Sequence, residues 1–231
     1  MQQDGDGDRI NIAIDGPAGA GKSTVARKVA EQLGYVYIDT GAMYRAVTLS
    51  AIRASIAPED GERLAAHATT LEIGLKPGEQ GQKVYLNGEN VTSEIRSREV
   101  TLLVSPVAAN ETVREVLGTL QRGFAESKGV VMDGRDIGSH VLPNAELKIF
   151  LTASVEERAR RRYNEIADSQ SITLEQLAVE IAERDRLDEG RDIAPLVCAK
   201  DALVMDSTAM TIDEVVEAIV KLSRTKLAEA K

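Results

Sequence analysis

The residues with the clearest chemistry lie in one short stretch near the amino terminus. Gly16, Gly21, Lys22 and Ser23 match the pattern G-x-x-x-x-G-K-[ST]. In such a loop the glycines let several backbone N–H groups turn toward one anion, at the positive end of the helix that follows. The lysine reaches the β- and γ-phosphates of a nucleoside triphosphate, and the hydroxyl takes a place on Mg²⁺. We therefore expect ATP to be bound by the whole loop, namely Gly16, Pro17, Ala18, Gly19, Ala20, Gly21, Lys22, Ser23 and Thr24.

The residues around the loop support this interpretation. Apolar residues alternate before it from Ile10 to Ile14, and Val25 and Val29 follow it at helical spacing, so the loop joins a strand to a helix. A glycine-rich turn that binds nothing is the simpler alternative, but the strand-loop-helix context makes a chance match rarer. A dinucleotide-binding turn is excluded, because Thr24 stands where G-x-G-x-x-G requires its third glycine.

Two further candidates follow predicted strands. Asp133 ends the apolar run Val130 to Asp133, and Arg45 comes shortly after a second predicted strand, Tyr35 to Asp39. Ligands of open α/β sheets lie at the carboxyl ends of the strands. Asp133 could therefore hold a water molecule on Mg²⁺, and Arg45 could hold an anion, although an exposed helix arginine is the simpler interpretation.

Arginines are concentrated on two predicted helices. The first extends from Ser154 to Ala167, with Ser154 and Glu157 spaced as a capping box. The second extends from Thr173 to about Glu189, after the polar stretch from Asp168 to Ser171. Like charges on one helix face repel each other, and an anionic ligand or nearby glutamates would offset this. Two such helices suit a lid over polyphosphate, with two solvated helices as the alternative. The shared face carries Arg158, Arg161 and Arg162, of which we assign Arg158 and Arg162 to ATP.

Composition limits the class of protein. The 231 residues are 43% hydrophobic but only 3% aromatic, which suits one domain with an aliphatic core and a helix-covered parallel sheet. The net charge of −9 argues against nonspecific nucleic-acid binding, and no apolar run suggests a membrane span or signal peptide. The single cysteine, Cys198, permits no intrachain disulfide and is a poor candidate for a catalytic thiol, so we expect a cytoplasmic protein. His67 and His140 are isolated and show no metal-ligand spacing.

The order of predicted elements indicates an α/β fold with an insertion. The first strand, helix and second strand form a crossover that implies a parallel pair. Two short alternating runs and the turn Asn87-Gly88 then predict a small antiparallel insertion between Leu71 and Thr92 that acts as a mobile flap. A helical stretch from Arg96 to Ser127, interrupted near Pro106 and Asn110, precedes further strands. These later elements are the strands Leu147 to Leu151 and Leu203 to Asp206, and the closing helix Ile212 to Ala228.

Five segments together resemble one family. The loop GPAGAGKST, the segment Asp39 to Arg45, the insertion, the turn Gly134 to Gly138 and the run Arg184 to Arg191 are similar to those of bacterial-type cytidylate kinases. The resemblance implies a P-loop nucleoside monophosphate kinase fold, with a five-stranded parallel sheet flanked by helices, a small antiparallel β insertion and a helical lid. It implies phosphoryl transfer from ATP to CMP or dCMP with Mg²⁺. The corresponding parts are a flexible tail (1–9), a core (10–65, 99–153 and 192–231), a CMP-binding insertion (66–98) and a lid (154–191).

The resemblance also assigns individual residues. It implies cytosine contacts from Ser105, Arg114 and Asp136, although an aspartate in a turn often bonds only to backbone amides. It implies a sugar contact from Asp188 and a hydroxyl from Thr40, where relatives often have serine. Leu187 stands where some members carry a charged residue. The implied phosphate ligands of CMP are Arg45, Arg135 and Arg191. The implied catalytic residues are Lys22, Arg135 and Arg184. Ser23 would bind the metal directly, and Asp133 would bind it through water.

The chemistry of the reaction fits these residues. Phosphoryl transfer needs two phosphates held in line and their charge neutralised, and an acceptor phosphate that is already ionised needs no general base. A sugar or shikimate kinase is the nearest alternative, with Asp39 or Asp133 taking the hydroxyl proton. A GTPase switch is the other alternative, although the chain has no N-K-x-D sequence. We expect a monomer whose partners are ATP and CMP or dCMP, with no nucleic acid and no membrane.

Overall fold

The structure is a computed structural model that describes residues 9–78, 81–166 and 172–229. The chain forms two compact units. The first comprises Met1–Tyr37 and Ser127–Lys231, and the second comprises Ile38–Glu126. These boundaries do not coincide with the predicted core, insertion and lid, and that partition stays a prediction.

The first unit is built on a five-stranded sheet in the order β2-β6-β1-β7-β8. The central strand β1 (Ile12–Asp15) is parallel to β6 (Val130–Gly134) and β7 (Leu147–Thr152), and β7 is parallel to β8 (Leu203–Asp206). Every residue of β1 and β6 is buried, as expected for parallel strands covered on both faces. The predicted five-stranded parallel sheet is confirmed. The chain passes into the second unit within the edge strand β2 (Val36–Asp39).

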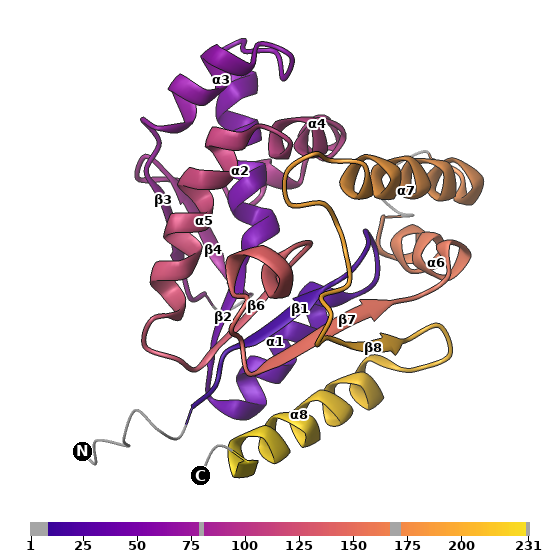
Figure 1. Ribbon diagram of the computed structural model, residues 1–231. Coiled ribbons are helices and arrows are strands. Elements are labelled where there is room, and N and C mark those ends of the chain that lie inside the picture. Colours follow the sequence, from indigo (N-terminus) through magenta and orange to yellow (C-terminus); the bar gives the residue numbers. More distant parts are fainter. Residues whose placement is uncertain (1–8, 79–80, 167–171, 230–231) are drawn as a thin grey trace. The chain divides into compact units, whose positions relative to one another are not determined.

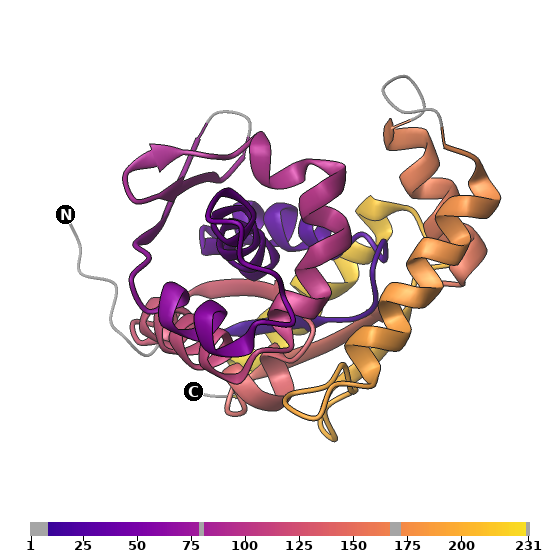
Figure 2. The same cartoon turned by 90° about the horizontal axis from the view of Figure 1, so that it is seen from above.

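Among its described residues, the first unit has four long helices. Figure 1 shows α8 (Ile212–Glu229) lying beside α1 (Lys22–Leu33), and Val25 and Val29 of α1 join Val216 and Ile219 of α8 in one apolar core. In Figures 1 and 2, α6 (Val155–Ile166) and α7 (Leu174–Glu189) lie side by side as a helical pair. The pair has a small core of its own, formed by Ala159, Leu177 and Ile181. Ala167 and the stretch from Asp168 to Ser171 lie outside the described residues.

The second unit combines helices with a separate three-stranded sheet. Its strands are β3 (Ile73–Lys76), β4 (Lys83–Leu86) and β5 (Glu89–Asn90), and β4 pairs antiparallel with both β3 and β5. Asn87 and Gly88 adopt φ angles of 49° and 83°, the left-handed conformation required by a tight hairpin turn. The predicted antiparallel insertion is therefore confirmed. The helical elements are α2 (Thr40–Arg53), α3 (Gly61–Ala68), η1 (Glu94–Arg96), α4 (Arg98–Ala108) and α5 (Glu111–Ala125).

The interruption predicted in the long helical stretch occurs at Asn110. The Asn110 side chain accepts a hydrogen bond from the N–H of Val113 and so begins α5. Pro106 lies inside α4, two residues before that helix ends. Within the part of the chain that the structure describes, no helix is both long and apolar enough to cross a bilayer.

Candidate active site

The glycine-rich loop of the first unit connects β1 directly to α1. Gly16, Gly19 and Gly21 adopt φ angles of 148°, 74° and 84°, which L side chains rarely adopt. A Cβ atom on Gly16 would lie 2.0 Å from the carbonyl oxygen of Leu151. Gly21 is the N-cap of α1 and has no side chain to offer the first helical amides, so these donors and the helix dipole face the loop. The geometry is that of an anion-binding loop.

Lys22 lies inside this loop. Its side chain is buried, and the Nζ atom donates a hydrogen bond of 2.7 Å to the carbonyl oxygen of Pro17. Burial and the neighbouring charge of Arg135 hold the pKa of the Lys22 ammonium well below its ordinary value, while the Asp133 carboxylate acts in the opposite direction. A bound polyphosphate would favour the charged ammonium, because opposite charge at short range raises the pKa of an amine.

The residues predicted to hold magnesium lie together. Ser23 Oγ donates a hydrogen bond of 2.8 Å to Asp133 Oδ2, and the Tyr37 hydroxyl donates one of 2.9 Å to Asp133 Oδ1. A hydroxyl and a carboxylate are the oxygen donors that Mg²⁺ prefers. Among the described residues there is no group of three or more His, Cys, Asp or Glu side chains that could hold a metal ion by themselves. This pair therefore fits a magnesium ion whose other ligands are water and phosphate oxygens.

Three of the predicted arginines surround Asp188 in the first unit. Arg135 Nε lies 2.8 Å from Asp188 Oδ2, and Arg191 Nε donates to the Asp188 carbonyl oxygen at 3.2 Å. Burial alone would raise the pKa of Asp188, but the charges of Arg135, Arg184 and Arg191 hold it below its ordinary value. Arg135 and Arg184 are also close enough to lower the pKa of Lys22. The structure thus brings the three predicted catalytic residues together, and Arg191 with them.

Asp136 begins the single helical turn η2 (Ile137–Val141), and its side chain does not cap that turn. The N–H groups of Ile137 and Gly138 instead donate to the two carboxylate oxygens of Asp15, at 2.8 and 2.7 Å. Burial of the Asp15 carboxyl raises its pKa to about 6, although the two amides oppose this. Two amides of this turn are therefore held by a residue distant in sequence, and the role of Asp136 itself stays a prediction.

Arg158 of α6 has its guanidinium inside the protein. It donates to the carbonyl oxygens of Ala153 and Ala18, at 2.9 and 2.8 Å, and forms an ion pair with Asp185 of α7. Asp185 Oδ1 also accepts the N–H of Ala18 at 3.0 Å, so one buried ion pair holds the tip of the loop. Arg162, by contrast, pairs at the surface with Glu165. Neither arrangement tests the assignment of Arg158 and Arg162 to ATP, which stays a prediction.

The second unit carries the other predicted CMP ligands on three packed helices. Thr40 is buried at the start of α2, and Ser105 is buried on α4. Arg45 Nη1 donates to Thr101 Oγ1 at 2.8 Å and to the carbonyl oxygen of Ile95 at 3.3 Å. Arg114 of α5 is buried, bonds to the carbonyl oxygen of Ala108, and lies 5.5 Å from the centre of the Tyr44 ring. Two buried or half-buried arginines are thus held in fixed positions within this unit.

The residues that sequence reasoning missed are mostly partners of the predicted ones. Asp15 accepts the Gly138 amide, and Tyr37 donates to Asp133. Thr101 accepts from Arg45, and Asp185 pairs with Arg158. Only Asp15 offered a signal, as the last residue of the strand that enters the loop.

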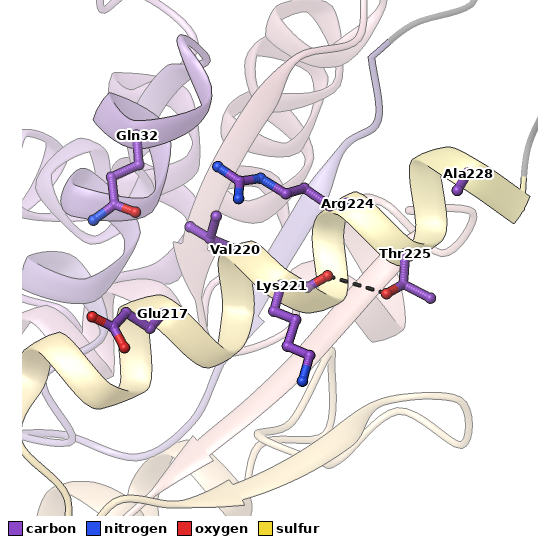
Figure 3. Close-up of a pocket in the computed structure, with 7 residues that line it drawn as sticks. All are labelled: Gln32, Glu217, Val220, Lys221, Arg224, Thr225 and Ala228. Atoms are coloured by element: carbon purple, nitrogen blue, oxygen red, sulfur yellow. Dashed lines mark hydrogen bonds between the residues drawn. The ribbon is translucent and has the colours of Figure 1, made fainter.

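A hollow between α1 and α8 contains none of the predicted site residues (Figure 3). It is lined by Gln32, Glu217, Val220, Lys221, Arg224, Thr225 and Ala228.

The parallel sheet, the glycine-rich loop and the lysine-arginine cluster define the chain as a P-loop nucleotide kinase. The family model for cytidylate kinase matches residues 12–225. A cytidylate kinase from an Exiguobacterium strain is 56% identical over 214 residues, which cover 92% of this chain and 96% of the relative. One from Geobacillus kaustophilus is 54% identical over 220 residues, covering 95% and 98%. The chain belongs to the cytidylate kinase family.

Membership of this family excludes the alternatives of a sugar kinase, a shikimate kinase and a GTPase. A solved structure of an uncharacterised protein from Eubacterium ventriosum shares the fold, with a TM-score of 0.51 and 10% identity, and covers 94% of this chain and 99% of that one.

Proposed function

We propose that the protein transfers the γ-phosphoryl group of ATP to the phosphate of CMP or dCMP and releases ADP with CDP or dCDP. The bond between the γ-phosphorus and its bridging oxygen breaks, and a bond forms from a CMP phosphate oxygen to that phosphorus. The observation that carries the proposal is the gathering of Arg135, Arg184 and Arg191 around Asp188, in a chain that belongs to the cytidylate kinase family. Arg135 and Arg184 also lie close to Lys22.

The proposed roles follow from charge and position. The loop amides and Lys22 hold the β- and γ-phosphates of ATP. Arg135 and Arg191 hold the acceptor phosphate, and the family resemblance assigns Arg45 to the same phosphate, because guanidinium groups bind phosphate through paired hydrogen bonds. Arg184 stabilises the charge on the group in transfer. The attacking oxygen is already ionised, so no residue needs to act as a general base.

Magnesium fits the hydroxyl of Ser23 and the carboxylate of Asp133, with Asp133 acting through water. When bound, the ion neutralises charge on the β- and γ-phosphate oxygens. The hydrogen bond between Ser23 and Asp133 supports this assignment, since it places two hard oxygen donors beside the start of α1.

Recognition of cytosine is proposed for Asp136, Ser105 and Arg114, with the sugar bound by Asp188 and a further hydroxyl supplied by Thr40. The Asp136 carboxylate would accept from the exocyclic amine of cytosine. Uracil presents a carbonyl at that position. Its oxygen and the Asp136 carboxylate are both acceptors, so UMP would be rejected. Support comes from the position of Asp136, which is buried and lies directly after Arg135 at the end of β6. Asp136→Ala is expected to depress activity on CMP much more than residual activity on UMP, and equal losses would count against this role.

The decisive test is a substrate panel. The purified protein is supplied with ATP, Mg²⁺ and one of CMP, dCMP, UMP or AMP, and ADP production is measured. Fast turnover with CMP or dCMP and slow turnover with AMP supports the proposal. Turnover that does not depend on any added nucleotide would refute it. We also propose that the active form is a monomer, which light scattering coupled to gel filtration would test, and that it acts in the cytoplasm.

A further inference from the structure

Asp15 is a buried carboxylate to which the proposed reaction gives no role. It is the last residue of β1, and its neighbours in register are Gly134 on β6 and Phe150 on β7. The residue is only 4% exposed to solvent. It therefore lies at the point where the central strand of the sheet becomes the ATP-binding loop.

Both carboxylate oxygens of Asp15 accept hydrogen bonds from the turn η2. Oδ1 accepts from the N–H of Ile137 at 2.8 Å, and Oδ2 accepts from the N–H of Gly138 at 2.7 Å. A Cβ atom on Gly138 would lie 3.3 Å from Asp15 Oδ2, so the glycine permits this close approach. Asp15 thus binds two amides that lie 122 and 123 positions after it in the sequence.

The two held amides follow directly after two proposed CMP ligands. Arg135 and Asp136 are linked by the main chain to β6 on one side and to the Asp15 clamp on the other. Asp136 supplies no side-chain cap, and its carbonyl oxygen accepts from His140 and Val141 to continue the turn. The direction of the chain at these two ligands is therefore set by Asp15.

A buried carboxylate is a costly way to hold a turn. Burial is the main influence on its ionisation, and the charge of Asp136 adds to it, while Lys22 partly offsets both. Burial raises the pKa of the Cys198 thiol, and the nearby Asp15 charge adds to this. One neutral acceptor could satisfy one amide, but only a carboxylate satisfies both with charge-assisted bonds.

We infer that Asp15 is a positioning residue for the acceptor: by clamping the amides of Ile137 and Gly138, it holds Arg135 and Asp136 in the geometry that binds CMP. The inference rests on the proposed function. It differs from a purely structural role, because it predicts a defect on the CMP side of the reaction and none on the ATP side.

The test is steady-state kinetics of Asp15→Asn. Asparagine has nearly the same shape but must turn an N–H group toward one of the two amides. We expect the KM for CMP to rise about 10- to 100-fold, from the loss of a charged hydrogen-bond acceptor, with the KM for ATP changed less than about twofold. Gly138→Ala places a Cβ atom 3.3 Å from Asp15 Oδ2 and 3.1 Å from Lys148 Cδ, and should reproduce the defect without changing any charge.

Glu146→Gln is the matched control. Glu146 is also a carboxylate that accepts a backbone amide, at 2.8 Å from Asn11 near the other end of β1, and it belongs to no proposed site. It should leave both KM values unchanged. Circular dichroism and thermal melts check that each variant is folded.

Each outcome decides the matter. A wild-type protein that does not phosphorylate CMP would refute the proposed function itself. An active wild type with a folded Asp15→Asn variant of unchanged KM for CMP, or with both KM values raised equally, would overturn the positioning role alone. If the variants do not fold, hydrogen exchange of the wild-type Gly138 amide replaces them. Slower exchange with saturating CMP, but not with ATP alone, is expected, and no change on adding CMP would overturn the inference.

Discussion

Replacing Arg158 with methionine should loosen the helical pair formed by α6 and α7 from the ATP-binding loop. The Arg158 side chain is 6% exposed, and its guanidinium bonds to two carbonyl oxygens and to Asp185. Its removal leaves the Asp185 carboxylate buried, with the Ala18 amide as the partner at 3.0 Å. Breaking one side of a buried ion pair costs about 3–5 kcal/mol. The small apolar core of the pair offers little to offset this.

Hydrogen exchange measures this loss directly. A cost of that size corresponds to exchange of the α7 amides faster by about 150- to 5,000-fold, while the amides of β1 and β6 keep their protection. The KM for ATP should rise together with this opening, because Arg158 and Asp185 both bond to the main chain of Ala18 in the loop. The double variant with Asp185→Leu should recover much of the protection, since apolar groups often replace a buried ion pair at no cost.

Arg160→Met is the control on the same helix. Arg160 pairs with Glu157 at the surface, and its side chain is 59% exposed, so its loss should cost less than about 1 kcal/mol. The reasoning is refuted if Arg158→Met weakens ATP binding while α7 keeps full protection. That result would mean that Arg158 contacts the nucleotide itself, as the sequence suggested.

Three further predictions address separate parts of the chain. The folded-state pKa of Asp15, about 6, lies above the ordinary 3.8, so its contribution to stability is complete below about pH 4 and is lost as the pH rises through 6. Urea unfolding should therefore show the stability of the wild type falling by about 3 kcal/mol relative to Asp15→Asn between pH 4 and 7, and a constant difference would contradict it. Gly16→Ala places a Cβ atom 2.0 Å from the carbonyl oxygen of Leu151, and circular dichroism should show no folded protein. Thr101→Val removes the hydroxyl acceptor of Arg45 and should raise the KM for CMP several-fold, about 1 kcal/mol, with the KM for ATP unchanged in the same assay.

The parts of the fold that the sequence predicted well depend on local signals. The turn at Asn87 and Gly88 needs left-handed conformations that these two residue types tolerate. Helix α7 begins at Thr173 with a capping box completed by Gln176, and Glu157 bonds to Ser154 at the start of α6. In each case the partners lie within four positions of each other, so their spacing is visible in the sequence.

The elements that the sequence did not predict lack such signals. Helix α3 has eight residues, begins at Gly61 and buries only Leu64 and Ala68, which is too little for a clear period. The turn η2 is held by Asp15 from 122 positions away. The same limit applies to the site. The loop motif is local and was predicted, but the pairing of Arg158 with Asp185 requires α6 and α7 to pack first.

The acidic composition of the chain is part of how it can hold arginines ready for phosphate. Guanidinium groups gathered without counter-charges would repel one another and turn toward solvent. In the first unit, Asp188 lies among Arg135, Arg184 and Arg191, whose charges hold the pKa of this buried carboxyl below its ordinary value. An arriving phosphate therefore meets side chains that are already ordered, and less conformational entropy is lost on binding. It follows that Asp188, which the resemblance assigns to the sugar, also orders the arginines. Asp188→Asn should therefore weaken binding even of an acceptor phosphate that carries no sugar.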